Sequence, residues 1–107
     1  MSDEPAWTEI ARVGDVPEDD VIEVVVGQRT IALFNLGGSY FATAGICTHA
    51  HARLAEGYLQ DEIIECPLHQ GLFHVPTGKA VAAPVSRDLE TFAVRVEGGA
   101  ILAKLPA

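Results

Sequence analysis

Two short segments of the chain combine residue types that bind transition metals. Cys47-Thr48-His49 places a thiol and an imidazole two positions apart, and Cys66-Pro67-Leu68-His69 places the same pair three positions apart. Thiolate and neutral imidazole suit borderline or soft transition metals, and not magnesium or calcium. If the residues between the two segments fold back as a hairpin, Cys47, His49, Cys66 and His69 meet at one site.

The mixture of residue types within each pair bears on which metal is bound. In a tetrahedral zinc site of two Cys and two His, cysteine usually pairs with cysteine and histidine with histidine along the chain. Here each segment supplies one of each. A binuclear iron–sulfur cluster fits this arrangement better, because the two cysteines can bind one iron and the two histidines the other. Zinc remains the alternative.

The other reactive residues have simpler interpretations. His51 and His74 are more typical of surface or hydrogen-bonding residues than of ligands. With two cysteines and no secretion signal, a stabilising disulfide is not expected. No Ser or Cys nucleophile with a suitable base is apparent, so the sequence does not indicate a catalyst of that type.

Charge and hydropathy exclude several classes of partner. Seven Lys and Arg against fifteen Asp and Glu give a formal net charge of -8, the wrong sign for binding a phosphate backbone. The longest apolar runs are too short to span a bilayer, and the acidic start of the chain lacks the positive region of a signal peptide. The expectation is a cytoplasmic protein, taken as a monomer, that binds neither nucleic acid nor membrane.

Acidic residues are concentrated in the first quarter of the chain. Solubility and the docking of a partner are equally good explanations of that concentration. Eight acids precede residue 24: Asp3, Glu4, Glu9, Asp15, Glu18, Asp19, Asp20 and Glu23.

The rest of the sequence predicts an all-β domain that positions these loops. Short runs rich in Val, Ile, Thr and Phe alternate with Gly and Pro, and helical periodicity is missing. Strands are predicted near 7–12, 21–26, 30–35, 40–43, 63–65, 72–75, 91–96 and 100–105. Two-residue glycine turns make some of these an antiparallel meander. In the strand at 91–96, Phe92, Val94 and Val96 are expected to face the core. Both cysteines and all four histidines lie in one segment, at about 45–80, which is predicted to be inserted between the strands.

The two segments and their surroundings resemble the Rieske motif. The run from Cys47 to Tyr58 (CTHAHARLAEGY) and Thr77-Gly78-Lys79-Ala80 are similar to the small Rieske ferredoxins of bacterial aromatic-ring dioxygenase systems, over nearly the whole chain. The resemblance implies one Rieske domain over 1–107, an antiparallel β-sandwich with a small inserted cluster-binding subdomain. It implies one [2Fe-2S] cluster, with Cys47 and Cys66 on the inner iron and His49 and His69 on the outer iron. Ala83-Pro84 is similar to a third loop that covers the cluster.

The sequence also differs from the high-potential branch of that family. In respiratory Rieske proteins a disulfide joins the ligand loops, and Ser and Tyr hydroxyls approach the sulfurs. Here Leu68 replaces a loop cysteine, Gly71 replaces the serine and Phe73 replaces the tyrosine. Fewer donors stabilise the reduced state less, so we expect a potential toward the low end of the Rieske range of roughly -150 to +300 mV.

The resemblance implies an electron-transfer component and not an enzyme. Such a component is a soluble one-electron carrier between an NADH-dependent flavoprotein reductase and a terminal Rieske oxygenase. The small Rieske subunit of a nitrite reductase is the alternative. An oxygenase itself would need a mononuclear iron site of two His and a carboxylate, for which only His51 and His74 remain. Partners are expected to dock at the cluster tip, where small or apolar residues form the centre of the contact: Ala50, Leu68, Leu72 and Pro84. Glu56 is expected to attract a basic partner from further away.

Overall fold

The short β-branched runs of the sequence form antiparallel strands throughout the computed structural model. The structure describes residues 6–48, 52–68, 71–82 and 87–106. In these residues eleven strands form three sheets, and the single helical element is a 3₁₀ turn, η1, at Leu54–Glu56. The all-β prediction is confirmed, and the described residues contain no helix long and apolar enough to cross a membrane.

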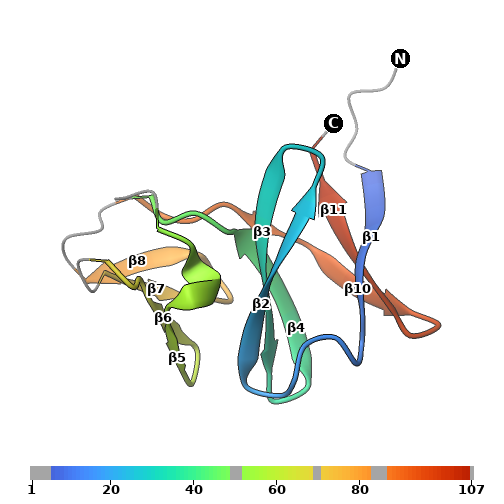
Figure 1. The fold of residues 1–107 in the computed structure, drawn as a ribbon, viewed down its shortest axis with the longest axis horizontal. Helices are drawn as coiled ribbons and strands as arrows, with labels where there is room; N and C mark the ends of the chain where they lie inside the picture. Colours follow the sequence, from blue (N-terminus) through green and yellow to red (C-terminus); the bar gives the residue numbers. More distant parts are fainter. Residues whose placement is uncertain (1–5, 49–51, 69–70, 83–86, 107) are drawn as a thin grey trace.

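Two of the sheets form a sandwich that we call the base (Figure 1). The first has the order β1-β11-β10, and the second has the order β2-β3-β4-β9. Their bounds are β1 Ala6–Arg12, β2 Asp20–Val26, β3 Arg29–Leu36, β4 Ser39–Ala44, β9 Thr91–Phe92, β10 Val94–Glu97 and β11 Ala100–Leu105. The meander prediction holds for β2, β3 and β4, whereas β1 pairs with the last strand, β11.

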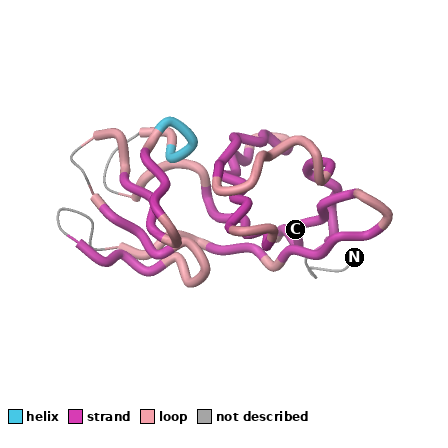
Figure 2. The backbone as a smooth tube through the Cα atoms, turned by 90° about the horizontal axis from the view of Figure 1, so that it is seen from below, coloured by secondary structure: helices cyan, strands magenta, loops and turns pink. Residues whose placement is uncertain are grey.

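The third sheet forms a separate small lobe, with the order β5-β6-β7-β8. Its strands are β5 Tyr58–Gln60, β6 Ile63–Glu65, β7 Leu72–His74 and β8 Lys79–Ala82. The view from below separates this lobe, which carries η1, from the curled strands of the base (Figure 2). The prediction found β6 and all of β7, with one residue too many at the end of β7, but missed β5 and β8.

Strand β3 joins the base to the small lobe because both of its faces are buried. Ile31 and Leu33 face the base core, together with Ile101 and Phe92. Ala32 and Phe34 belong to a second core, which also includes Ile64, Phe73 and both cysteines. A strand buried on both faces has a continuous apolar run, which explains why the segment from Ile31 to Phe34 does not alternate.

The predicted strand at 91–96 is interrupted, and that prediction needs correction. Thr91 and Phe92 pair with β4 of the second sheet, whereas Val94 to Glu97 pair with β11 of the first. The chain therefore crosses between the sheets at Ala93, and one inward face cannot continue along it. Phe92 is buried as predicted, but Val96 is 47% exposed and does not face the core.

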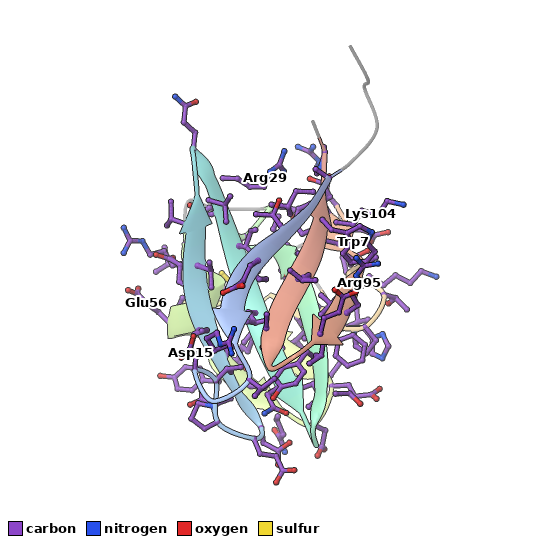
Figure 3. All side chains as sticks on the ribbon, turned by 90° about the vertical axis from the view of Figure 1, so that its right-hand side faces the viewer. Trp7, Asp15, Arg29, Glu56, Arg95 and Lys104 are labelled. Carbon is purple, nitrogen blue, oxygen red and sulfur yellow. The ribbon has the colours of Figure 1, made fainter. Side chains whose placement is uncertain are left out.

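The turns of the base use the backbone conformation that glycine permits. Gly37 and Gly38 connect β3 to β4 with φ angles of 60° and 96°. Such left-handed angles favour glycine in two-residue hairpin turns. On the outer face of the first sheet, the Arg95 guanidinium stacks 4.3 Å from the ring centre of Trp7 (Figure 3). That face lies opposite the small lobe, so the stack stabilises the base and not the site.

Candidate metal centre

The two cysteines lie next to each other between the small lobe and the base. The side chains of Cys47 and Cys66 lie close enough for the Cys47 thiol to raise the pKa of Cys66. They are 4% and 1% exposed and form no disulfide. Both pack in the core that contains Phe34 and Phe73. The fold therefore brings together two soft ligands from segments that are far apart in the sequence.

Both cysteine loops close in the same way. The Cys47 backbone N–H donates to the carbonyl of Ala52 at 2.9 Å, and the Cys66 N–H donates to the carbonyl of Gly71 at 2.8 Å. In each loop the acceptor lies five positions after the cysteine. The matched closure presents two thiols from equivalent positions, which is the arrangement that a symmetric pair of ligands requires.

The surroundings of Cys66 favour its neutral thiol. Burial and the hydrogen bond with Cys47 raise its pKa from 9.0 to about 11, whereas a backbone hydrogen bond from Leu68 acts in the opposite direction. A metal binds the thiolate, so binding must displace this proton. Two adjacent buried thiols suit a positively charged metal partner and fit the cysteine side of an iron–sulfur cluster.

The predicted histidine ligands cannot be placed in the same way. His49 and His69 lie outside the described residues, as does His51. The structure therefore brings together two of the four predicted ligands, and the other two stay a prediction. The residues directly before them, Thr48 and Leu68, are described and lie one and two positions after the cysteines of the two loops.

His74 has a structural role that agrees with its interpretation as a hydrogen-bonding residue. Its Nδ1 is 2.8 Å from the Thr77 hydroxyl, and its Nε2 is 3.0 Å from Glu62 Oε1. It pairs with Ile63 at the end of the β6–β7 hairpin away from Cys66. Both ring nitrogens thus have partners in the small lobe, on the residues that precede β6 and follow β7.

A hollow of about 350 Å³ lies beside the second cysteine loop, between η1 and residues 67–68. It is lined by Ala52, Arg53, Glu56, Pro67 and Leu68. Leu68 is 51% exposed, although it is a large apolar side chain. Of the predicted docking residues, Leu68 and Glu56 line this hollow and Leu72 begins β7, whereas Ala50 and Pro84 lie outside the described residues. Sequence reasoning missed Arg53 and Pro67, because no local pattern shows that η1 and this loop are neighbours.

The acidic stretch before residue 24 does not surround the cysteines. Three of its six described acids, Asp15, Glu18 and Asp19, lie on the loop between β1 and β2, at the lower end of the base in Figure 1. Several accept backbone hydrogen bonds: Asp15 from Arg12, Asp19 from Gly37, and Asp20 from Val21. These carboxylates therefore stabilise local turns, and any attraction of a partner to the tip acts from a distance.

The fold and the paired cysteine loops define an iron–sulfur electron-transfer protein, and comparison with known proteins supports this class. The sequence model of the Rieske [2Fe-2S] domain matches residues 6–93. The ferredoxin component of naphthalene 1,2-dioxygenase/salicylate 5-hydroxylase systems from Ralstonia is 42% identical over 99 residues, or 92% of this chain and 95% of the relative.

Solved structures give the same result. The Sphingomonas yanoikuyae B1 ferredoxin superposes with a TM-score of 0.90 at 32% identity, covering 94% of this chain and 100% of the other. A chain in the complex of reduced oxygenase and oxidized ferredoxin in carbazole 1,9a-dioxygenase has a TM-score of 0.86 at 33% identity, covering 92% of each chain. The chain belongs to the Rieske [2Fe-2S] family. Its cofactor is a Rieske-type [2Fe-2S] cluster, and its class is an electron-transfer ferredoxin and not a catalyst.

Proposed function

We propose that this chain is the ferredoxin component of an aromatic-ring-hydroxylating dioxygenase system. It receives single electrons from an NADH-dependent flavoprotein reductase and passes them to a terminal Rieske oxygenase. The observation that carries the proposal is the buried, adjacent pair Cys47 and Cys66 on matched loops. The relatives named above are ferredoxins, and one related structure is a complex of a ferredoxin with an oxygenase, which favours this role over a nitrite reductase subunit.

The proposed ligands are Cys47 and Cys66 for the inner iron and His49 and His69 for the outer iron. Burial of both cysteines supports the inner position, because partners then approach from the side of the loop tips. Residues 1–107 form a single Rieske domain in this proposal, and about 45–80 form its cluster-binding subdomain. The cytoplasmic location and the monomeric state remain predictions of the sequence.

The chain's own residues would serve electron transfer by holding the site rigid and dry on one side. When bound, the cluster supplies a centre that gains and loses one electron. Phe34, Phe73 and Ile64 are fully buried around the cysteines and exclude water from that side. Closed loops and a packed core leave little room for the cysteines to move. A site that changes little between two charge states has a small reorganisation cost.

Partners would dock at the loop tips, where Leu68 and the adjacent hollow offer an apolar centre. A carrier must leave one partner to meet the next, and transient redox contacts typically bury less than about 1,200 Å². Glu56, on the rim of the hollow, would attract a basic partner surface through charge that salt screens.

Metal analysis and spectroscopy of the purified protein test the ligand assignment. We expect a brown-red protein with about two irons and two labile sulfides per chain, and a reduced-state electron spin resonance signal typical of imidazole-bound clusters. His69→Ala should abolish that signal. The matched control is His74→Ala, which removes a histidine bonded to Glu62 and Thr77 and should keep the signal. Colourless protein with one zinc would overturn the proposal.

The partners need a separate test. Reduction of the loaded protein by NADH should require a flavoprotein reductase, and the reduced protein should be reoxidised by a terminal Rieske oxygenase with substrate and oxygen. A protein that the reductase reduces but that supports nitrite reduction instead would favour the alternative.

A further inference from the structure

Four consecutive residues, 87–90, connect the two cysteine loops to the base. The Arg87 carbonyl accepts a hydrogen bond from the Thr48 hydroxyl at 2.7 Å. The Asp88 carboxylate and the Leu89 N–H both bond to the segment that contains β8. The Glu90 carbonyl accepts from the N–H of Ala44, the last residue of β4, at 2.8 Å. We call residues 87–90 the connecting segment.

Thr48 is the contact of the first cysteine loop with this segment. It follows Cys47 directly and belongs to no strand. The acceptor lies 39 positions further along the chain. A bond of 2.7 Å between a hydroxyl and a carbonyl lies at the optimal distance for this type of hydrogen bond. This hydrogen bond therefore restricts the movement of Cys47 relative to residue 87.

Asp88 and Leu89 make the contact on the side of the second cysteine loop. Asp88 Oδ1 accepts from the Ala80 N–H at 2.9 Å, and the Leu89 N–H donates to the Gly78 carbonyl at 2.7 Å. Gly78 has a φ of +76°, and a Cβ atom there would collide with the Leu89 carbonyl. This close approach places the connecting segment along β8, which pairs with β7, the strand that follows the second loop.

The connecting segment also enters the core that contains the thiols. Leu89 is 4% exposed and packs in the cluster of buried residues that includes Cys47 and Cys66. One segment thus contacts the first loop, the strand pair of the second loop, and the base. Its hydrogen bonds fix the separation of two loops that no strand pairing joins directly among the described residues.

We infer that Thr48 and Asp88 are positioning residues for the iron–sulfur site, which hold the two cysteine loops at the separation that the cluster requires. The inference rests on the proposed ligand set, and it goes beyond it by assigning this separation to the connecting segment. Neither side chain is a ligand. Each acts through a hydrogen bond to backbone on an element that carries or supports a ligand loop.

The test measures the rate at which a chelator removes iron from the loaded protein, followed by the loss of visible absorbance. Thr48→Val keeps the side-chain shape but removes the hydroxyl, and it should speed iron loss roughly fivefold, the effect of one ordinary hydrogen bond. Thr48→Ser keeps the hydroxyl and should stay near the wild-type rate. Asp88→Ala should also speed loss, whereas Asp88→Asn retains an acceptor oxygen and should behave nearly as wild type.

Two further measurements separate positioning from general stability. Thr43→Val removes a hydroxyl that bonds to the Ala44 carbonyl at 2.9 Å within the base, and it should leave the iron-loss rate unchanged. The double variant Thr48→Val/Asp88→Ala should lose iron more slowly than the product of the single effects predicts, because both bonds act through one segment. Loaded Thr48→Val should also show broadened reduced-state electron spin resonance lines, since the site geometry becomes less uniform.

Failure of the positioning roles and failure of the proposed ligand set give different results. Wild-type iron loss in Thr48→Val and Asp88→Ala would overturn the positioning roles, as would a Thr48→Ser variant that loses iron as fast as Thr48→Val. Fully multiplicative effects in the double variant would overturn the shared segment. If Cys66→Ala kept its iron, the ligand set itself would be wrong, whatever the result at Thr48.

Discussion

Replacing Leu68 by Asp should slow electron transfer at every ionic strength. Leu68 is 51% exposed beside the second cysteine loop, so docking at the tip would cover its remaining surface. Full burial of a leucine side chain is worth about 1.5–3 kcal/mol, so covering half of one contributes about 1 kcal/mol to docking. Leu68→Ala loses that contribution, which corresponds to about a fivefold weaker complex. Leu68→Asp must in addition desolvate a carboxylate, and we expect it to weaken docking by more than tenfold.

The measurement is the second-order rate of reduction by the cognate flavoprotein reductase in a stopped-flow instrument, over a range of salt concentrations. Val25→Asp is the matched control, because Val25 is 61% exposed on β2 of the base. It introduces the same charge at an exposed apolar position outside the tip, and its rate should stay near wild type. If Leu68→Asp is reduced at the wild-type rate, docking at the tip is wrong. If Val25→Asp is slowed as much, the partner docks on the base.

The charged rim of the hollow should respond differently to salt. Glu56→Lys should slow the reaction at low salt and approach the wild-type rate at high salt, because salt screens exposed charges. Glu18→Lys makes the same change of charge on the loop between β1 and β2 and should have a smaller effect. Equal salt-dependent effects of both variants would mean that net charge, and not a rim at the tip, steers the partner.

Three further predictions concern the site itself. His69→Cys should keep a cluster but lower its midpoint potential in a redox titration, because a thiolate adds negative charge to the outer iron; an unchanged potential would mean that His69 is not a ligand. Gly71→Ser with Phe73→Tyr should raise the midpoint potential, by about 40 mV for each hydroxyl that donates a hydrogen bond of about 1 kcal/mol. A lack of any rise with the cluster intact would mean that other features set the potential. In the metal-free chain, the raised pKa of Cys66 stabilises the fold below pH 9.0, and this contribution of about 2–3 kcal/mol is lost as the pH rises toward about 11. Denaturant titrations should show that extra loss in the metal-free wild type and not in metal-free Cys66→Ser.

Much of the fold follows from local sequence pattern, but two features do not. Strands β2, β3, β4 and β11 were predicted within one or two residues, because glycine turns punctuate alternating or apolar runs. The break at Ala93 was missed, since Phe92 and Val94 continue an alternating pattern while the chain passes from one sheet to the other. Strands β5 and β8 were missed because three or four residues are too few to show a period.

The candidate site shows the same division between local and distant information. The spacing within each Cys and His pair predicts a metal centre without any structure, and the fold places Cys47 beside Cys66 as that prediction requires. The contacts that hold the loops have no such signal. The bond from Thr48 to residue 87 spans 39 positions, and that from Asp88 to Ala80 depends on the path of β8. A hydroxyl or carboxylate in a loop sequence does not reveal its acceptor or donor.

The double burial of β3 explains how a small chain can hold a metal centre rigidly. Through Ile31 and Leu33 the strand belongs to the base core, and through Ala32 and Phe34 it belongs to the core that contains the cysteines. The small lobe alone has four strands of three or four residues, too little to bury much apolar surface. It therefore depends on β3 and on the metal, whose binding energy also stabilises the fold. In this short lobe Leu68 stays exposed beside the second cysteine loop, where a partner could approach, while β3 packs against the cysteine side.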